Sequence, residues 1–157
     1  MTCIFLSALV IASAVDFIKQ YEGYSSVPYK DMDGTYKCGY GFDCKGKKTY
    51  TREEADKELR RVVEEQFAKA LQRNCKNSLT HNQSVAILSF SYNLGVNGTL
   101  RSDVWKFSQK GMHVKAAQSF KLYVRSGGKI IKGLVKRREA EMKLYKKRDN
   151  LKNEKEK

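Results

Sequence analysis

Residues 17–42 read FIKQYEGYSSVPYKDMDGTYKCGYGF, and the change of texture inside this stretch indicates the fold class. Apolar residues up to Tyr21 recur at helical spacing, so we expect a helix that begins near Ser13 and ends at Gly23. Beyond Gly23, aromatic and β-branched residues are mixed with glycines as far as Tyr50, which is typical of a small antiparallel sheet with tight turns. A helix followed by such a sheet predicts the α+β class.

Helix signals dominate the rest of the chain. The capping box Thr51–Glu54 predicts the start of a long helix that ends near Arg73. A second capping box, Thr80–Gln83, opens a helix that is apolar nearly all round up to Gly95, so we expect it to lie at the centre of the core. The predicted fold is therefore α+β but mostly α, with further helices over residues 102–111, residues 112–124 and from Lys132 onward.

The chain has 157 residues, of which 31 are Lys or Arg and 17 are Asp or Glu, so its formal net charge is +14. Its length suits a single domain, and a hydrophobic content of 41% excludes a wholly disordered chain. No apolar run reaches the ~18 residues that a membrane span requires. The charge, which is densest from Lys129 to Arg148, predicts a polyanionic partner: nucleic acid, an anionic membrane or an acidic cell-wall polymer. The other interpretation is a solvated basic surface that only aids solubility.

Residues 3–15 form an apolar stretch that ends in small residues, as a short secretory segment does, although it lacks a basic start. We therefore expect residues 1–12 to be a signal or signal-anchor segment, residues 13–145 to be the globular domain and residues 146–157 to be a charged tail. This interpretation predicts a secreted or exported protein. The alternative is that the apolar stretch simply extends the first helix.

The four cysteines do not form a metal motif. Cys38 and Cys44 are close enough to staple a hairpin in an oxidising compartment, and two buried free thiols are the alternative. If Cys3 is lost with a leader, Cys75 has no obvious partner. No Cys/His group has zinc spacing, so we expect neither a metal nor a cofactor.

Glu22 ends the first predicted helix, and Asp31 follows beyond a predicted strand. Two carboxylates placed in this way can face each other across a cleft, as glycoside hydrolysis requires. One of them must donate a proton to the leaving oxygen while the other stays ionised. Glu22 suits the donor role, because the negative end of the helix dipole disfavours a second negative charge there.

Short motifs surround these carboxylates and continue along the chain in unbroken order. They are FIKQYEG (17–23), PYKD (28–31), GYG (39–41), LTHNQ (79–83), LSF (88–90), YNLG (92–95), LRS (100–102), GGK (127–129) and GLVKRREAE (133–141). Together they resemble phage-type lysozymes, the endolysin family of glycoside hydrolase family 24, over roughly residues 13–145.

The resemblance implies a lysozyme-like fold, in which a small N-terminal sheet lobe is joined by a long helix to a C-terminal helical lobe. It also implies cleavage of the β-1,4 bond between N-acetylmuramic acid and N-acetylglucosamine in peptidoglycan. Glu22 matches the proton donor and Asp31 the aspartate that helps hold the attacking water. Asn93 matches a position lining the cleft, and the run Arg137–Arg138–Glu139 matches a basic motif on the last helical segment. Asn93 and Arg137 are therefore candidate substrate contacts, with lobe-stabilising salt bridges as the alternative for the basic run.

Two positions depart from the family pattern. Lys37 stands where the family has its third catalytic residue, a threonine, and Thr35 lies two residues earlier. Phe42 replaces a histidine that commonly follows the Gly-x-Gly motif. Because an ammonium offers donors only, Lys37 cannot accept a proton from water. It could pair with Asp31, lie across the cleft, or swing outward and leave the place to Thr35 or a water molecule.

Two functions follow. The first is an exported, monomeric lysozyme that lyses bacterial walls, with peptidoglycan glycan strands as substrate and a basic surface that steers it to the anionic envelope. The alternative is a catalytically impaired lysozyme-fold protein that binds peptidoglycan without cutting it, and Lys37 is the residue that favours it. No recognised nucleic-acid-binding motif is present, so we expect no nucleic acid partner.

Overall fold

The computed structural model describes residues 2–46 and 49–149 of the chain. Its elements are, in order, α1 (Ala8–Glu22), β1 (Ser25–Lys30), β2 (Tyr36–Gly39), β3 (Phe42–Asp43), α2 (Arg52–Val62), η1 (Val63–Ala68), α3 (Lys69–Asn74), α4 (His81–Leu94), α5 (Val96–Arg101), α6 (Asp103–Gln109), α7 (His113–Ser119), η2 (Phe120–Leu122), β4 (Arg125–Ser126), β5 (Lys129–Ile130) and α8 (Lys132–Lys146).

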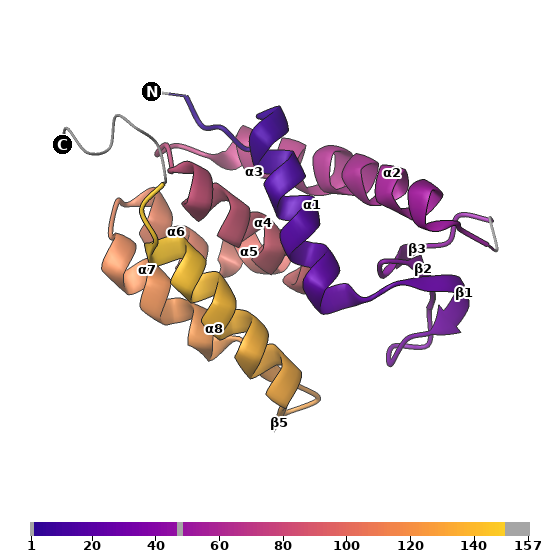
Figure 1. Ribbon diagram of the computed structural model, residues 1–157. Helices are drawn as coiled ribbons and strands as arrows, with labels where there is room; N and C mark the ends of the chain where they lie inside the picture. Colours follow the sequence, from indigo (N-terminus) through magenta and orange to yellow (C-terminus); the bar gives the residue numbers. More distant parts are fainter. Residues whose placement is uncertain (1, 47–48, 150–157) are drawn as a thin grey trace.

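The sheet β1-β2-β3 is antiparallel and lies at one end of the molecule, beside the end of α1 and the start of α2 (Figure 1). Helices α4 to α8 gather at the other end. The prediction of a mostly helical α+β protein with a small antiparallel sheet is confirmed.

The long helix predicted from Thr51 is present, and its capping box is complete: Thr51 Oγ1 accepts from the Glu54 N–H, and the Glu54 carboxylate accepts from the Thr51 N–H. Its middle, η1, has π-helical turns, while the backbone stays helical from α2 through α3. This composite helix joins the sheet to the helical end.

The core is built around α4, in which every side chain from Ser84 to Ser91 is buried. The helix begins at the predicted capping box of Thr80 and Gln83 and ends at Gly95. It packs against α1 on one side and α8 on the other. Because α1 and α8 each carry part of the polar network described below, the packing of α4 against both helices holds the two parts in place.

The first helix begins earlier than expected. Ser7 is the residue before the first turn, and α1 starts at Ala8 rather than near Ser13. Val10 and Ile11 are fully buried and extend the apolar stripe of the helix backward by a turn. The expected boundary between residues 12 and 13 therefore falls inside α1.

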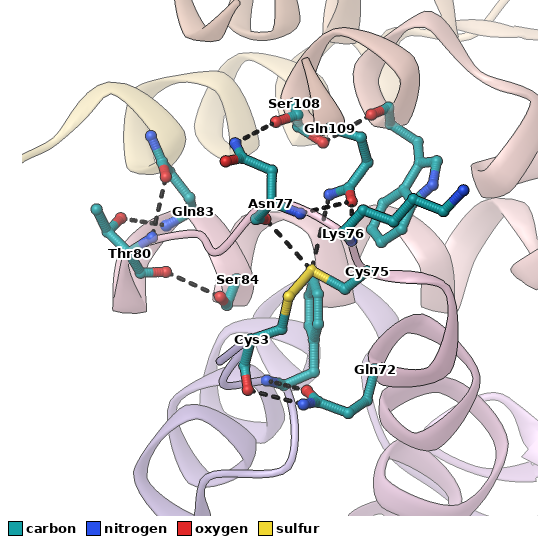
Figure 2. The surroundings of a disulfide bond; sticks show 12 residues. Cys3, Gln72, Cys75, Lys76, Asn77, Thr80, Gln83, Ser84, Ser108 and Gln109 are labelled. Atoms are coloured by element: carbon teal, nitrogen blue, oxygen red, sulfur yellow. Dashed lines mark hydrogen bonds between the residues drawn. A yellow bond between two sulfur atoms is a disulfide. The ribbon is translucent and has the colours of Figure 1, made fainter. Parts of the chain in front are cut away.

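The segment before α1 is bound to the end of α3 and the residue after it through both side-chain and backbone contacts (Figure 2). Cys3 forms a disulfide with Cys75, and Phe5 is completely buried. The side-chain amide of Gln72 accepts from the Phe5 N–H and donates to the Cys3 carbonyl, at 3.0 and 2.7 Å. In this structure residues 3–11 are thus packed against the rest of the fold.

Three local features differ from expectation. Helix α5 and the β4–β5 hairpin were not predicted, because each is only a few residues long and the hairpin forms around Gly127 and Gly128. The charged tail was expected from residue 146, but Asp149 is buried and accepts from the backbone N–H groups of His81 and Asn82 at the start of α4. The remainder of that tail, residues 150–157, lies outside the described residues.

Within the described ranges, we find no helix with the length and apolarity to cross a membrane.

Candidate active site

Glu22 is the last residue of α1, and its position is set by the helix end. Gly23 follows with a φ of 68°, so the chain leaves the helix and turns directly into the sheet. The Glu22 side chain is mostly covered, with 19% of its surface exposed. A carboxylate is therefore placed at the junction of the helix and the sheet.

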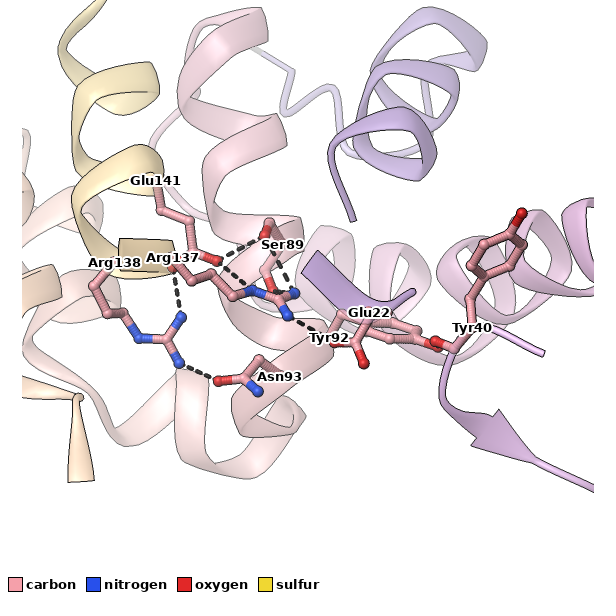
Figure 3. A network of polar contacts seen from close by, with 8 residues as sticks. All are labelled: Glu22, Tyr40, Ser89, Tyr92, Asn93, Arg137, Arg138 and Glu141. Carbon is pink, nitrogen blue, oxygen red and sulfur yellow. Dashed lines mark hydrogen bonds and ion pairs between the residues drawn. The ribbon is translucent and has the colours of Figure 1, made fainter. Parts of the chain in front are cut away.

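One oxygen of this carboxylate is held by Arg137 of α8. The guanidinium Nη1 donates to Glu22 Oε2 at 2.6 Å, although the two residues lie 115 positions apart (Figure 3). Arg137 is itself buried and donates to the Ser89 carbonyl and to Glu141 Oε2. The first helix, α1, and the last helix, α8, are thus linked through the Glu22 carboxylate.

Behind Arg137 lies a buried polar network. Glu141 is completely buried and accepts from Arg137, Arg138 and the Ser89 hydroxyl. Burial lowers the pKa of Arg138, and its pairing with Glu141 acts in the opposite direction. Every member has a partner, as buried charges require, so this network holds Arg137 in a fixed place.

The other oxygen of Glu22 faces the turn between β2 and β3. A methyl group placed on Gly41 would lie 2.7 Å from Glu22 Oε1 and 3.6 Å from the Tyr29 hydroxyl oxygen. Gly41 also has a φ of 89°, which side-chain-bearing residues rarely adopt. Glycine is thus required here for both conformation and space, and it brings backbone, carboxylate and phenol close together.

Tyr29 lies between the two predicted carboxylates. Burial and, next, the charges of Glu22 and Asp31 raise the pKa of the Tyr29 phenol, while Lys37 opposes them. The residue pairs with Lys37 in the β1–β2 register. The Tyr29 phenol is thus influenced by the charges of Glu22, Asp31 and Lys37.

Asp31 follows β1 and is exposed. Its backbone N–H donates to the Thr35 carbonyl at 2.8 Å, and its Oδ1 accepts from the Met32 N–H at 2.9 Å. The Thr35 hydroxyl does not bind Asp31, because it donates to Asp33 Oδ1 at 2.6 Å, and the Thr35 N–H donates to the same oxygen. These hydrogen bonds from Thr35 lower the pKa of Asp33.

Lys37 is bound to a different carboxylate. Its ammonium lies 2.8 Å from Asp43 Oδ1, across the β2–β3 pair, and this hydrogen bond raises the pKa of Lys37. The pairing of Lys37 with Asp31, one of the three placements given above, is therefore not seen, because Asp43 holds the ammonium instead. The disulfide between Cys38 and Cys44 closes the same hairpin, so the free-thiol alternative is wrong in this structure.

Asn93 lies one step further from Glu22. Its Oδ1 accepts from Arg138, which is linked through Glu141 to Arg137. A surface hollow opens at this point, lined by Asn93, Leu94, Leu122, Tyr123, Arg125, Ser126, Leu134 and Arg138. Arg137, by contrast, is buried and forms salt bridges with Glu22 and Glu141.

Tyr92 ties the helical end of the molecule to the turn that faces Glu22. Its hydroxyl donates to the Tyr40 carbonyl at 2.8 Å, next to Gly41 in the sequence. Burial, and next the charge of Glu22, raises the pKa of the Tyr92 phenol. This hydrogen bond fixes the position of the β2–β3 turn relative to α4.

Sequence reasoning missed Tyr29, Tyr92 and Glu141 as members of the site. For Tyr29 a signal existed, because residues 29 and 31 of an extended strand point to the same face. No signal could pair Glu22 with Arg137, since that contact depends on how α1, α4 and α8 pack. Among the residues described, no group of His, Cys, Asp and Glu side chains is placed to hold a metal ion.

This chain is similar to known proteins along most of its length. The profile of the Phage lysozyme family matches residues 19–141. The endolysin of Bacillus phage B103 is 34% identical over 138 residues, which cover 85% of this chain and 52% of that protein. The chain thus spans about half the length of the Bacillus phage endolysins that it matches.

Solved structures agree in fold. The muramidase domain of SpmX from Asticaccaulis excentricus superposes with a TM-score of 0.76 at 27% identity, covering 87% of this chain and 96% of that one. An endolysin from Escherichia coli O157:H7 phage FAHEc1 gives a TM-score of 0.74 at 28% identity, covering 90% and 92%. With the family profile spanning the sheet, the long helix and the Arg137 network, this chain belongs to the phage lysozyme family.

Proposed function

We propose that this protein is a muramidase that hydrolyses the β-1,4 bond between N-acetylmuramic acid and N-acetylglucosamine in bacterial peptidoglycan. The observation that carries the proposal is the asymmetric setting of the Glu22 carboxylate. Arg137 binds Oε2, while Oε1 faces the space beside Gly41 and Tyr29. In this proposal Oε1 carries the proton that passes to the leaving glycosidic oxygen.

Asp31 is proposed to hold the attacking water and to stabilise the positive charge that develops on the sugar ring. It is exposed, its backbone N–H donates to the Thr35 carbonyl across the turn, and its charge, like that of Glu22, raises the pKa of Tyr29. Thr35 is engaged with Asp33 and is not assigned a catalytic role. Asn93 is proposed to contact the glycan at the edge of the hollow beside Arg138.

The lysine at the family's threonine position does not favour the binding-only alternative in this setting. Its ammonium is paired with Asp43, so neither Asp31 nor the space beside Gly41 is blocked by a direct contact with it. A water molecule between Asp31 and the sugar can then be held by Asp31 alone. We therefore propose a working enzyme rather than an impaired one.

We further propose that the protein works outside the cytoplasm as a monomer on the anionic bacterial envelope, with residues 3–12 retained. Two disulfides support this, because such bonds persist in oxidising compartments. One of them uses Cys3, and removal of the first twelve residues would also take Phe5, Val10 and Ile11 out of the core.

The test is lysis of purified peptidoglycan, followed as a fall in turbidity. Glu22→Gln keeps the shape of the side chain and removes the transferable proton, so the rate is expected to fall by about 100- to 10,000-fold. Glu65→Gln is the matched control, because Glu65 is an exposed glutamate that lies far from Glu22 in the sequence and pairs with Lys69. This variant should leave the rate near that of the native protein. Equal rates for the native protein and Glu22→Gln would refute the proposal.

A further inference from the structure

The positive charge of this protein is concentrated in one part of the chain. Residues 1–100 hold thirteen Lys and Arg against eleven Asp and Glu, a net of +2. Residues 101–149 hold fifteen against four, a net of +11 out of the +14 of the whole chain. The segment from α5 to the end of α8 is therefore strongly basic, whereas the part that contains Glu22 and Asp31 is nearly neutral.

Most of these basic residues face solvent, and in the part of the chain that the structure describes the exposed ones form no ion pair. Arg137 and Arg138 are buried and are balanced by Glu22 and Glu141. Asp149 is buried as well and is bound to backbone N–H groups. The exposed cations of this segment are Arg101, Lys106, Lys110, Lys115, Lys121, Arg125, Lys129, Lys132, Lys136, Lys143, Lys146, Lys147 and Arg148.

Four of these lysines form a row along the outer face of α8 and its last cap residue: Lys132, Lys136, Lys143 and Lys147, which we call the α8 lysine row. Their spacing is that of one helix face, and at 1.5 Å per residue the row is about 22 Å long. Glu139 lies in the same row and is its one acidic member. No ion pair of the described residues involves these lysines.

The face of α8 that carries the lysine row is not used for packing within the described part of the protein. Its opposite side packs against α4, η2 and α7, and no other element crosses the helix where it lies at the front of the helical lobe in Figure 1. A shallow hollow within the row is lined by Lys136, Glu139, Ala140, Met142 and Lys143. The row is thus an open, slightly concave cationic track.

We propose that the α8 lysine row binds a cell-wall polymer of repeating phosphodiesters, and so holds the enzyme on the wall. This inference rests on the proposed function, because such a polymer lies beside the peptidoglycan that the enzyme would cut. Lysine ammonium groups bind phosphates as compact point charges, and lysines one or two helical turns apart on one face can contact several phosphates of an extended chain. Several weak contacts of this kind add up to useful retention.

A lipid surface fits the row less well. An interfacial helix inserts a broad apolar face between the headgroups, whereas Leu144 and Met142 of α8 pack against the core and are partly buried. The fully exposed residues of the row are all charged. The geometry therefore favours a soluble polyanion over a membrane.

The experiment measures binding to poly(glycerol phosphate) in the full-length Glu22→Gln background, over about 50 to 200 mM NaCl. The row variant changes Lys132, Lys136, Lys143 and Lys147 to Gln. The matched control changes Lys57, Arg60, Arg73 and Lys76, four exposed cations outside the basic segment, to Gln. Both variants carry the same net charge, and circular dichroism checks that both are folded.

The row variant is expected to bind at least tenfold more weakly, with a salt dependence flatter by about three in log–log slope. The control should stay within about twofold of the parent. Adding Glu139→Gln to the parent should strengthen binding. Equal losses in the row and control variants would overturn the proposal, since binding would then follow net charge alone.

Two further arms separate competing partners. Anionic phosphatidylglycerol vesicles and duplex DNA of random sequence replace the polymer, and tighter row-dependent binding to either one would overturn the assignment to a wall polymer. Lysis of polymer-free peptidoglycan by the native chain tests the proposed muramidase activity separately. The binding result therefore stands or falls without that activity.

Discussion

Among single residues, Gly41 has little free space around it on the side of the Glu22 carboxylate. Glu22 Oε1 would lie only 2.7 Å from a methyl group at this position. The same carboxylate is fixed from the other side by Arg137. Glu22 therefore has little freedom to move away from an added atom.

Gly41→Ala is expected to reduce lysis on the order of a hundredfold, the effect of a misplacement of about 1 Å in a catalytic group. Gly34→Ala is the matched control, since Gly34 has a nearly identical φ of 87° but nothing within 4 Å of the added methyl. Both variants should lose about 1–3 kcal/mol of unfolding free energy from the strained backbone. Activity losses of similar size in the two variants would show that Gly41 acts through stability only.

Lys37 provides a second test at this scale. Because Asp43 already pairs with the ammonium, Lys37→Thr should change the rate of lysis by no more than about tenfold, or about 1.4 kcal/mol in the barrier. Asp43→Asn releases the ammonium toward Asp31 and should lower the rate. A gain of about a hundredfold or more in Lys37→Thr would mean that the native lysine impairs water positioning.

Sequence and structure agree best at the scale of elements. Capping boxes at Thr51 and Thr80 and the glycine after Glu22 marked helix ends correctly, because these signals are local hydrogen bonds and backbone angles. The start of α1 was placed too late, because an apolar segment at the N-terminus has the same composition whether it is a leader or a buried helix turn. Only packing against α4 and the bond to Cys75 distinguish the two.

The site was predictable to a similar degree. Glu22 and Asp31 could be proposed from their places on a helix end and a strand end, together with the family motifs. The partner of Lys37 could not, since Asp43 becomes its neighbour only through the β2–β3 register. The same holds for Arg137, which meets Glu22 through the packing of three helices.

The two disulfides should differ in what they contribute. The Cys3–Cys75 bond closes a separation of 72 residues and the Cys38–Cys44 bond one of 6. Loop entropy then predicts losses of about 4 and about 2 kcal/mol when each pair is changed to Ala, measured by urea unfolding. Lysis per folded molecule should fall more in the Cys38 and Cys44 variant, because that bond closes the hairpin that carries Gly41. The reverse order in both measurements would contradict these roles.

For the whole molecule, alkaline pH is expected to weaken the fold. Burial raises the pKa of Tyr92, so the folded state keeps its proton while the unfolded state releases it above pH ~10. Stability from this group is therefore complete below that pH and is lost as the pH rises further. Tyr92→Phe should flatten the decline of unfolding free energy between about pH 9 and 11. An unchanged slope would show that Tyr92 does not contribute to it.

The proposed function requires that the bond between N-acetylmuramic acid and N-acetylglucosamine is hydrolysed and that Glu22 is needed for its cleavage. The most direct measurement digests purified peptidoglycan in heavy-oxygen water, reduces the new ends with borohydride and identifies them by mass spectrometry. With the native protein we expect labelled N-acetylmuramic acid at the new reducing ends, and with Glu22→Gln we expect none. New ends at N-acetylglucosamine, unlabelled anhydro sugars, or labelled muramic acid ends from Glu22→Gln at the native rate would contradict it.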